Sequence, residues 1–391
     1  RVSVMKVRKK APPPRSGTRG PLGLRGVALI LVVGFSGCTK TSTWLGGCAK
    51  RDPVSPSSRP QYAAPRGSDQ SSGARGATAP GLAGAPGVTR YRAAVIDPRV
   101  HEIPPDLLAH VFADPEGYIE AVVDTLVYDI DDELLIVKRL HDWIAEHIVY
   151  DVEAYYGTIP RGSQGWIETL KTRRSVCEGY ARLLVRMCDL AGVECIKISG
   201  YGRGIGFDLF EEGRPERSNH AWNAVRVDGK WHLLDGTWDA GHVRGKQFVK
   251  RYSTDYLYLE PRAFLHTHLP DDSRWQLLPE PLDTEAFLDL PPLKGGFFSH
   301  GLSFESSIAR RNAIGDWMVL GVQRPAGVDV TAKLFDPQGK EVPERTFLQP
   351  DGDRVVVHAR FPSLGRWSLK LFAKSTAETI YADVGTLGFR A

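Results

Sequence analysis

The sequence contains no apolar run long enough to cross a bilayer as a helix. The run from Val27 to Phe35 falls well short of the ~20 residues that a membrane span needs. His141 and His147, which share one helix-like segment, do not have a convincing metal-ligand spacing, so we expect no metal and no other cofactor. With 42% hydrophobic residues in 391, the chain is neither fibrous nor wholly disordered.

Acidic residues are absent before Thr39, whereas eight basic residues lie between Arg1 and Arg25. A basic stretch followed by a short apolar run is typical of a secretory signal. Subtracting these eight charges from the net charge of +4 leaves about −4. We therefore expect no nucleic-acid partner, because the remaining basic residues form no stripe that would bind phosphates.

The apolar run ends in FSGC, in which two small residues precede Cys38. This resembles the signal box of a bacterial lipoprotein, although Phe35 replaces the usual leucine. We expect a signal segment over residues 1–38 and a lipid anchor at Cys38 that holds the protein on a membrane of the bacterial cell envelope. By resemblance to Gram-negative lipoproteins, Thr39 in place of an aspartate implies retention in the outer membrane, facing the periplasm or the exterior. Cys48 in LGGC, or an ordinary cleaved signal, are the alternatives.

From Ala49 to Thr89 the chain is rich in Ala, Gly, Pro, Ser and Arg and has almost no large apolar residue. Such a composition buries too little surface to offset the entropy lost on ordering. We therefore expect a disordered tether over residues 39–90.

Beyond the tether, the sequence predicts two folded domains. Residues 91–280 begin with helical patterns such as ELLIVKRLHDWIAEHI, in which Trp143 belongs to the core. A proline-rich linker is expected over residues 281–296. Residues 297–391 contain alternating runs separated by turn signals, which indicates a β-sandwich: WMVLGV, VDVTAKLF, RVVVHARF and WSLKLFA. The fold class is therefore α+β.

Cys177 stands at the start of a helical pattern, SVCEGYARLLVRM, that follows a loop-like LKTRRS. Free backbone N–H groups and the positive end of the helix dipole favour a thiolate there and can also bind an oxyanion. The alternative is a small buried thiol, which we favour for Cys188 and Cys195.

His220 and Asp235 flank a hairpin in which Asp228-Gly229 joins HAWNAVRV to WHLLDGTW. With a two-residue turn, Trp222 would oppose Asp235 and His220 would oppose Thr237. The two side chains would then lie on the same face as diagonal neighbours, roughly 6–8 Å apart at the backbone. This geometry suits a histidine base and the carboxylate that orients it.

The sequences SVCEGYARLL, SNHAWNAVRVDGKWHLLDGTWDAG and YLYLEPRAFLHTHLPDDSRWQLL resemble the transglutaminase-like superfamily, and within it the kyphoscoliosis peptidase group. The resemblance covers roughly residues 131 to 280 and implies a papain-like, transglutaminase-type core. It also implies a catalytic triad with Cys177 as nucleophile, His220 as general base and acid, and Asp235 as the group that orients the imidazole.

Such a triad would act on a protein or peptide substrate through a thioester intermediate. Water as the acceptor would give a peptidase or amidase, whereas an amine would give a transglutaminase, and the sequence leaves both open. The alternative class is a non-enzymatic envelope adaptor that binds protein chains in the papain-like cleft. We expect the glycine-rich GYGRGIGF to be a flexible loop near this cleft and not a nucleotide site, because it opens no helix.

Overall fold

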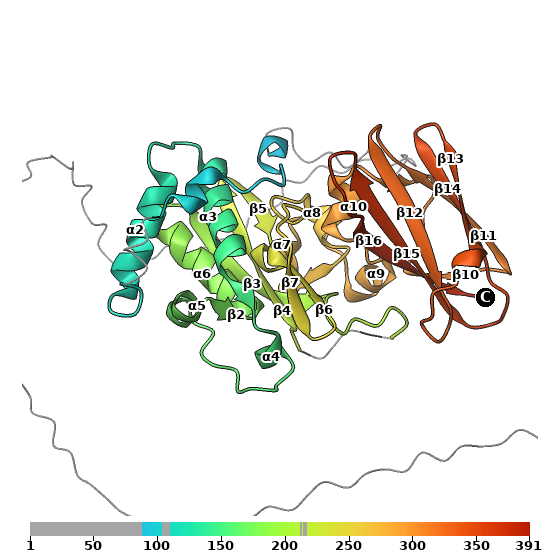
Figure 1. Cartoon of the computed structure of the whole chain (residues 1–391), viewed down its shortest axis with the longest axis horizontal. Coiled ribbons are helices and arrows are strands. Elements are labelled where there is room, and N and C mark those ends of the chain that lie inside the picture. Colours follow the sequence, from blue (N-terminus) through green and yellow to red (C-terminus); the bar gives the residue numbers. More distant parts are fainter. Residues whose placement is uncertain (1–87, 104–109, 212, 214–216) are drawn as a thin grey trace, which may run out of the picture. The chain divides into compact units, whose positions relative to one another are not determined.

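The computed structural model describes residues 88–103, 110–211, 213 and 217–391 (Figure 1). The expected signal segment, Cys38, Cys48 and nearly all of the expected tether lie outside these residues. Within the described residues, no helix is both long and apolar enough to span a membrane.

The first part of the described chain is helical, as its pattern predicts. Asp114 and Asp132 cap two helices by accepting hydrogen bonds from Gly117 and Leu135, respectively. Trp143 is fully buried in the core that these helices share. The elements up to the nucleophile segment are η1 (Thr89–Tyr91), η2 (Pro98–His101), α2 (Pro115–Val127), α3 (Glu133–His147), β1 (Val149–Tyr150), α4 (Val152–Tyr155), α5 (Trp166–Thr172) and β2 (Arg174–Ser175).

An antiparallel sheet with the strand order β5-β4-β3-β8 lies beside α6 (Cys177–Leu190), which packs against β3 and β4 (Figure 1). The Asp228-Gly229 turn has positive φ at both residues, as a two-residue hairpin requires. The remaining elements of this domain are β3 (Glu194–Gly202), β4 (His220–Val227), β5 (Lys230–Leu234), α7 (Gly236–Ala240), β6 (Gly241–Arg244), β7 (Gln247–Lys250), α8 (Pro261–Phe264), β8 (His268–Pro270) and η3 (Ser273–Gln276).

The C-terminal region forms two four-stranded sheets whose inward residues make one apolar core, which is a β-sandwich. One sheet has the order β10-β16-β15-β12 and the other β13-β14-β11-β9. Strand β12 shows the alternation most clearly, with every second residue from Val328 to Leu334 buried. The elements are β9 (Ser303–Phe304), β10 (Arg311–Ala313), β11 (Trp317–Gln323), β12 (Val328–Phe335), η4 (Pro343–Arg345), β13 (Thr346–Asp351), β14 (Arg354–Arg360), β15 (Arg366–Ser375) and β16 (Ala382–Arg390).

The segment expected to be a linker contains regular structure. It holds α9 (Thr284–Asp289) and the first residues of α10 (Gly295–Ser299). Phe287 is fully buried, and the buried guanidinium of Arg203 donates hydrogen bonds to the carbonyls of Phe287 and Leu290. These contacts attach α9 to the end of β3.

Candidate active site

Cys177 is the first residue of α6, as its sequence pattern predicts, and its side chain is buried. No side chain caps this helix start, and the Gly179 N–H donates to the Val176 carbonyl, so the N–H groups of Cys177 and Glu178 are the ones available to a bound group. The Gln164 side-chain oxygen accepts hydrogen bonds from the Ser175 hydroxyl (2.7 Å) and the Val176 N–H (3.2 Å). The residues that precede the thiol are thereby held in place.

His220 is the first residue of β4 and lies opposite Gly200 of β3. Its ring packs near the indoles of Trp222 and Trp238, with centroid distances of 5.9 and 5.1 Å. A Cβ atom at Gly202 would approach the His220 Cβ to 2.9 Å, which is too close. The first residues of the glycine-rich segment belong to strand β3 and are not a loop, and the missing side chain of Gly202 lets the backbone approach His220.

Asp235 is the N-cap of α7, the short helix that follows β5. Its Oδ1 accepts the N–H groups of Thr237 (2.9 Å) and Trp238 (3.3 Å), and its Oδ2 lies 2.7 Å from His220 Nε2. The predicted register holds through the Asn223–Leu234 pair. The expected opposition of His220 to Thr237 is wrong, because the chain leaves the sheet after Leu234 to enter α7.

The Cys177 thiol lies close enough to His220 to raise the pKa of the imidazole. Because Nε2 of His220 faces Asp235, Nδ1 is the ring nitrogen that remains to exchange a proton with the Cys177 sulfur. Burial alone would lower the pKa of His220, but the charges of Asp235 and Cys177 and their hydrogen bonds raise it to about 10. The site thus favours an imidazolium beside the sulfur.

His268 is a residue of this site that the sequence analysis missed. It is fully buried, and its Nε2 lies 3.1 Å from the same Asp235 Oδ2 that contacts His220. Burial raises the pKa of Asp235, but the His220 charge and the hydrogen bonds from both histidines hold it below its ordinary value. His268 lies in FLHTHLP, which is part of a sequence that carries the family resemblance. No spacing rule connects His268 to Asp235.

Among the described residues, three side chains have ligand atoms within 4.8 Å of one another and could together hold a metal ion: His220, Asp235 and His268. Imidazole and carboxylate are suitable ligands for zinc. The hydrogen bonds between the same atoms account for their convergence without an ion.

A second buried polar network lies behind α7. His141 of α3 contacts Asp142 through Nδ1 and Asp239 of α7 through Nε2, both at 3.1 Å, and Asp142 in turn pairs with Lys138. Burial lowers the pKa of His141, but the hydrogen bonds that its ring donates to Asp142 and Asp239, together with the charges of these carboxylates, raise it to about 9. Asp239 also accepts the Tyr256 N–H. This network fixes α7, and with it Asp235, against α3.

The other predicted residues lie apart from this chemistry. Cys188 is fully buried, as predicted for both Cys188 and Cys195, whereas Cys195 is partly exposed; neither forms a disulfide. His147 bonds the Trp143 carbonyl within its own helix.

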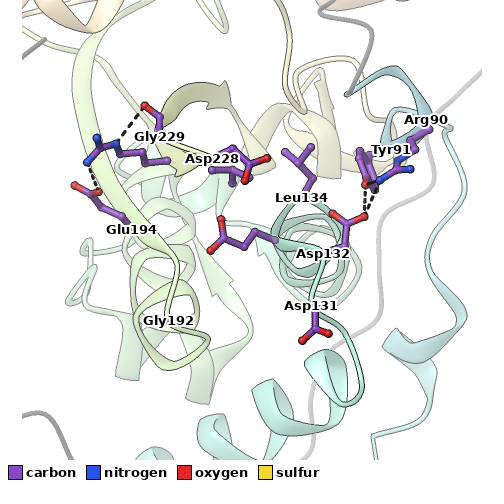
Figure 2. Close-up of a pocket in the computed structure, with 12 residues that line it drawn as sticks. Arg90, Tyr91, Asp131, Asp132, Leu134, Gly192, Glu194, Asp228 and Gly229 are labelled. Atoms are coloured by element: carbon purple, nitrogen blue, oxygen red, sulfur yellow. Dashed lines mark hydrogen bonds and ion pairs between the residues drawn. The ribbon is translucent and has the colours of Figure 1, made fainter.

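A pocket of about 990 Å³ lies away from these residues, between the start of α3 and the β4–β5 turn (Figure 2). Its acidic side chains are partly paired, since Asp132 binds Arg90 and Glu194 binds Arg226. None of Cys177, His220 and Asp235 lines it.

Comparison with known proteins shows what this core resembles. Residues 120–236 match the model of the transglutaminase-like superfamily. The core is transglutaminase-like. This transglutaminase-like core and the sheets that follow it make up the expected α+β architecture.

Mouse kyphoscoliosis peptidase is 32% identical over 271 residues, which are 68% of this chain and 40% of the relative. Fruit-fly Hillarin is 34% identical over 139 residues, which are 32% of this chain and 17% of Hillarin. The chain thus spans about two fifths of the kyphoscoliosis peptidase.

Two solved structures show weaker likeness. A crystal structure of a TGase is 22% identical and covers 39% of this chain and 36% of its own, with a TM-score of 0.25. The Lin-41 filamin domain is 17% identical and covers 23% of this chain and 91% of its own, with a TM-score of 0.18.

Proposed function

We propose that this chain is a thiol-dependent hydrolase or acyltransferase that acts on peptide, isopeptide or glutamine carboxamide bonds through Cys177, His220 and Asp235. The observation that carries the proposal is the 2.7 Å contact of His220 Nε2 with Asp235, which leaves Nδ1 for the thiol at the start of α6. The transglutaminase-like core supports the same chemistry.

In the first half-reaction, His220 Nδ1 holds the thiol proton and the Cys177 thiolate attacks the substrate carbonyl carbon. The oxyanion that forms is stabilised by N–H groups in the first turn of α6. His220 then gives its proton to the leaving amine or ammonia, the C–N bond breaks, and a thioester remains on Cys177. Asp235 keeps the ring oriented and stabilises its positive charge throughout.

In the second half-reaction, an acceptor attacks the thioester and the thiol is released. His220 removes a proton from the acceptor and returns it to the sulfur. Water yields a carboxylic acid, which is peptide hydrolysis or deamidation, whereas a lysine amine yields an isopeptide bond. The residues that form the triad serve all three outcomes, so the acceptor that reaches the thioester decides the reaction.

The test is incubation of the full chain with a peptide library, with and without an added primary amine, followed by mass spectrometry. A mass gain of one amine with loss of ammonia identifies transamidation, a gain of about 1 Da identifies deamidation, and new termini identify hydrolysis. Cys177→Ala is the control that must lose every product. An inert wild-type protein that still retains peptides would contradict the proposal and favour the adaptor alternative.

We also propose that Cys38 carries a lipid anchor, with residues 39–90 as a tether that links the catalytic domain to a membrane of the bacterial cell envelope. The basic stretch, the short apolar run and the small residues before Cys38 support this proposal. We further propose that residues 281–296 divide the catalytic domain from the sandwich and that the sandwich braces the catalytic domain. The strands beyond α9 contain none of the three proposed catalytic residues.

A further inference from the structure

Strand β3 lies between two strands that each supply a histidine. His220 of β4 lies opposite Gly200, and His268 of β8 lies opposite Gly202. Because glycine has no side chain, the two rings can meet across β3, with their centroids 5.3 Å apart. Both rings therefore reach Asp235 from separate strands.

The carboxylate of Asp235 is held at both oxygens. Two backbone N–H groups of α7 occupy Oδ1, and His220 and His268 share Oδ2 at 2.7 and 3.1 Å. If His268 were removed, the His220 ring would be the one remaining side chain of these two that holds Asp235 Oδ2. A buried carboxylate with fewer donors has more freedom to leave the orientation that its partner needs.

The surroundings of His268 determine which of its nitrogens carries a proton. Its Nδ1 lies 2.9 Å from the Thr267 hydroxyl, which can donate to it or to the more distant Phe264 carbonyl at 3.4 Å, while Nε2 faces the Asp235 carboxylate and must donate. Trp238 and Phe264 pack on the ring with centroid distances of 4.4 and 4.3 Å. Burial lowers the pKa of His268 to about 4, although Asp235 opposes that shift, so the ring is neutral at pH 7.

We propose that His268 is a positioning residue whose Nε2–H fixes Asp235 Oδ2 in the orientation that holds His220 against Cys177. This inference rests on the proposed function, in which His220 activates Cys177. This role does not require His268 to touch the thiol or the reacting carbonyl. It acts only through Asp235.

The test compares two substitutions that differ in where they place an amide. In His268→Gln the side-chain nitrogen can take the place of Nε2 and donate to Asp235. In His268→Asn the nitrogen corresponds to Nδ1 and stops short of the carboxylate. Both variants keep a polar amide among the same aromatic rings, so circular dichroism and thermal unfolding serve as checks on the fold.

The readout is the rate at which iodoacetamide alkylates Cys177 between pH 5 and 9, followed by mass spectrometry with Cys195 as the internal reference. We expect His268→Asn to slow alkylation at pH 6 by about 10-fold to 100-fold and His268→Gln to stay within about 3-fold of wild type. If both variants are alkylated at the wild-type rate, or if both are slowed by the same factor, the His268 ring only fills space and the inference is wrong.

A second measurement on the wild-type protein does not depend on turnover. Nitrogen-15 NMR should show His268 at pH 7 as a neutral ring with its proton on Nε2. A proton on Nδ1, or an imidazolium, would overturn the inference. If wild-type Cys177 is no more reactive than Cys195, the proposed function fails, and this spectrum still decides whether His268 donates to Asp235.

Discussion

Asp235 and Asp239 lie one helical turn apart in α7, and each buried carboxylate binds a histidine from a different element. Asp235 contacts His220 of β4, and Asp239 contacts His141 of α3. A helix of five residues is not stable by itself, so these contacts determine where α7 lies. The proposed catalytic carboxylate therefore depends on a charge network that takes no part in the chemistry.

Cys177→Ala should abolish turnover while the thermal unfolding temperature stays close to that of wild type. Cys177→Ser should be nearly as inactive, because a hydroxyl is far less acidic than a thiol. The measurement is product formation from the peptide library, and Cys188→Ala is the matched control for loss of a thiol from the same helix. Appreciable turnover by the Ala variant would refute the assignment.

Asp235→Asn should lower kcat by roughly 10³-fold to 10⁴-fold with a much smaller effect on KM, since the amide no longer stabilises the imidazolium or fixes its tautomer. Asp228→Asn is the control, because Asp228 lies exposed in the β4–β5 turn. A fall confined to KM would show that Asp235 binds substrate instead.

Gly202→Ala should suppress the reactivity of Cys177, because the added methyl group would push the His220 ring out of position. Gly162→Ala is the control, since a Cβ there meets no atom within 4 Å. Iodoacetamide labelling at pH 6 measures the effect in both variants. Equal labelling of Cys177 in the two variants would mean that β3 shifts to accommodate the methyl group without moving His220.

The charge on His141 should make stability depend on pH. The pKa of His141 is raised from 6.5 to about 9 in the folded state. Its contribution to the free energy of unfolding is therefore complete below pH 6.5 and is lost as the pH rises through 9. Urea unfolding of wild type and His141→Gln should show a difference in the free energy of unfolding that shrinks between pH 6.5 and 9. His147→Gln should show no such decline, because burial lowers the pKa of His147.

Cys38→Ser should prevent attachment of a fatty-acid label in a bacterial host and move the protein from the detergent phase to the aqueous phase. Cys48→Ser is the matched control and should keep both properties. An intact N-terminal mass with unmodified Cys38 would contradict the anchor and leave the proposed chemistry unaffected.

The local sequence determined most elements of this site. A helix start at Cys177 and a two-residue turn at Asp228-Gly229 follow from short-range periodicity and turn preference, so both could be predicted. Strand alternation likewise predicted the sandwich strands, such as β12, because every second side chain must be buried.

Tertiary structure alone decided how these elements meet. His268 comes 33 residues after Asp235 and reaches it only because β8 pairs with β3, and no local pattern specifies that pairing. The same holds for His141 and Asp239, which are 98 residues apart. Periodicity reports which face of an element is apolar, whereas the partner of a buried polar group is chosen by the packing of the whole domain.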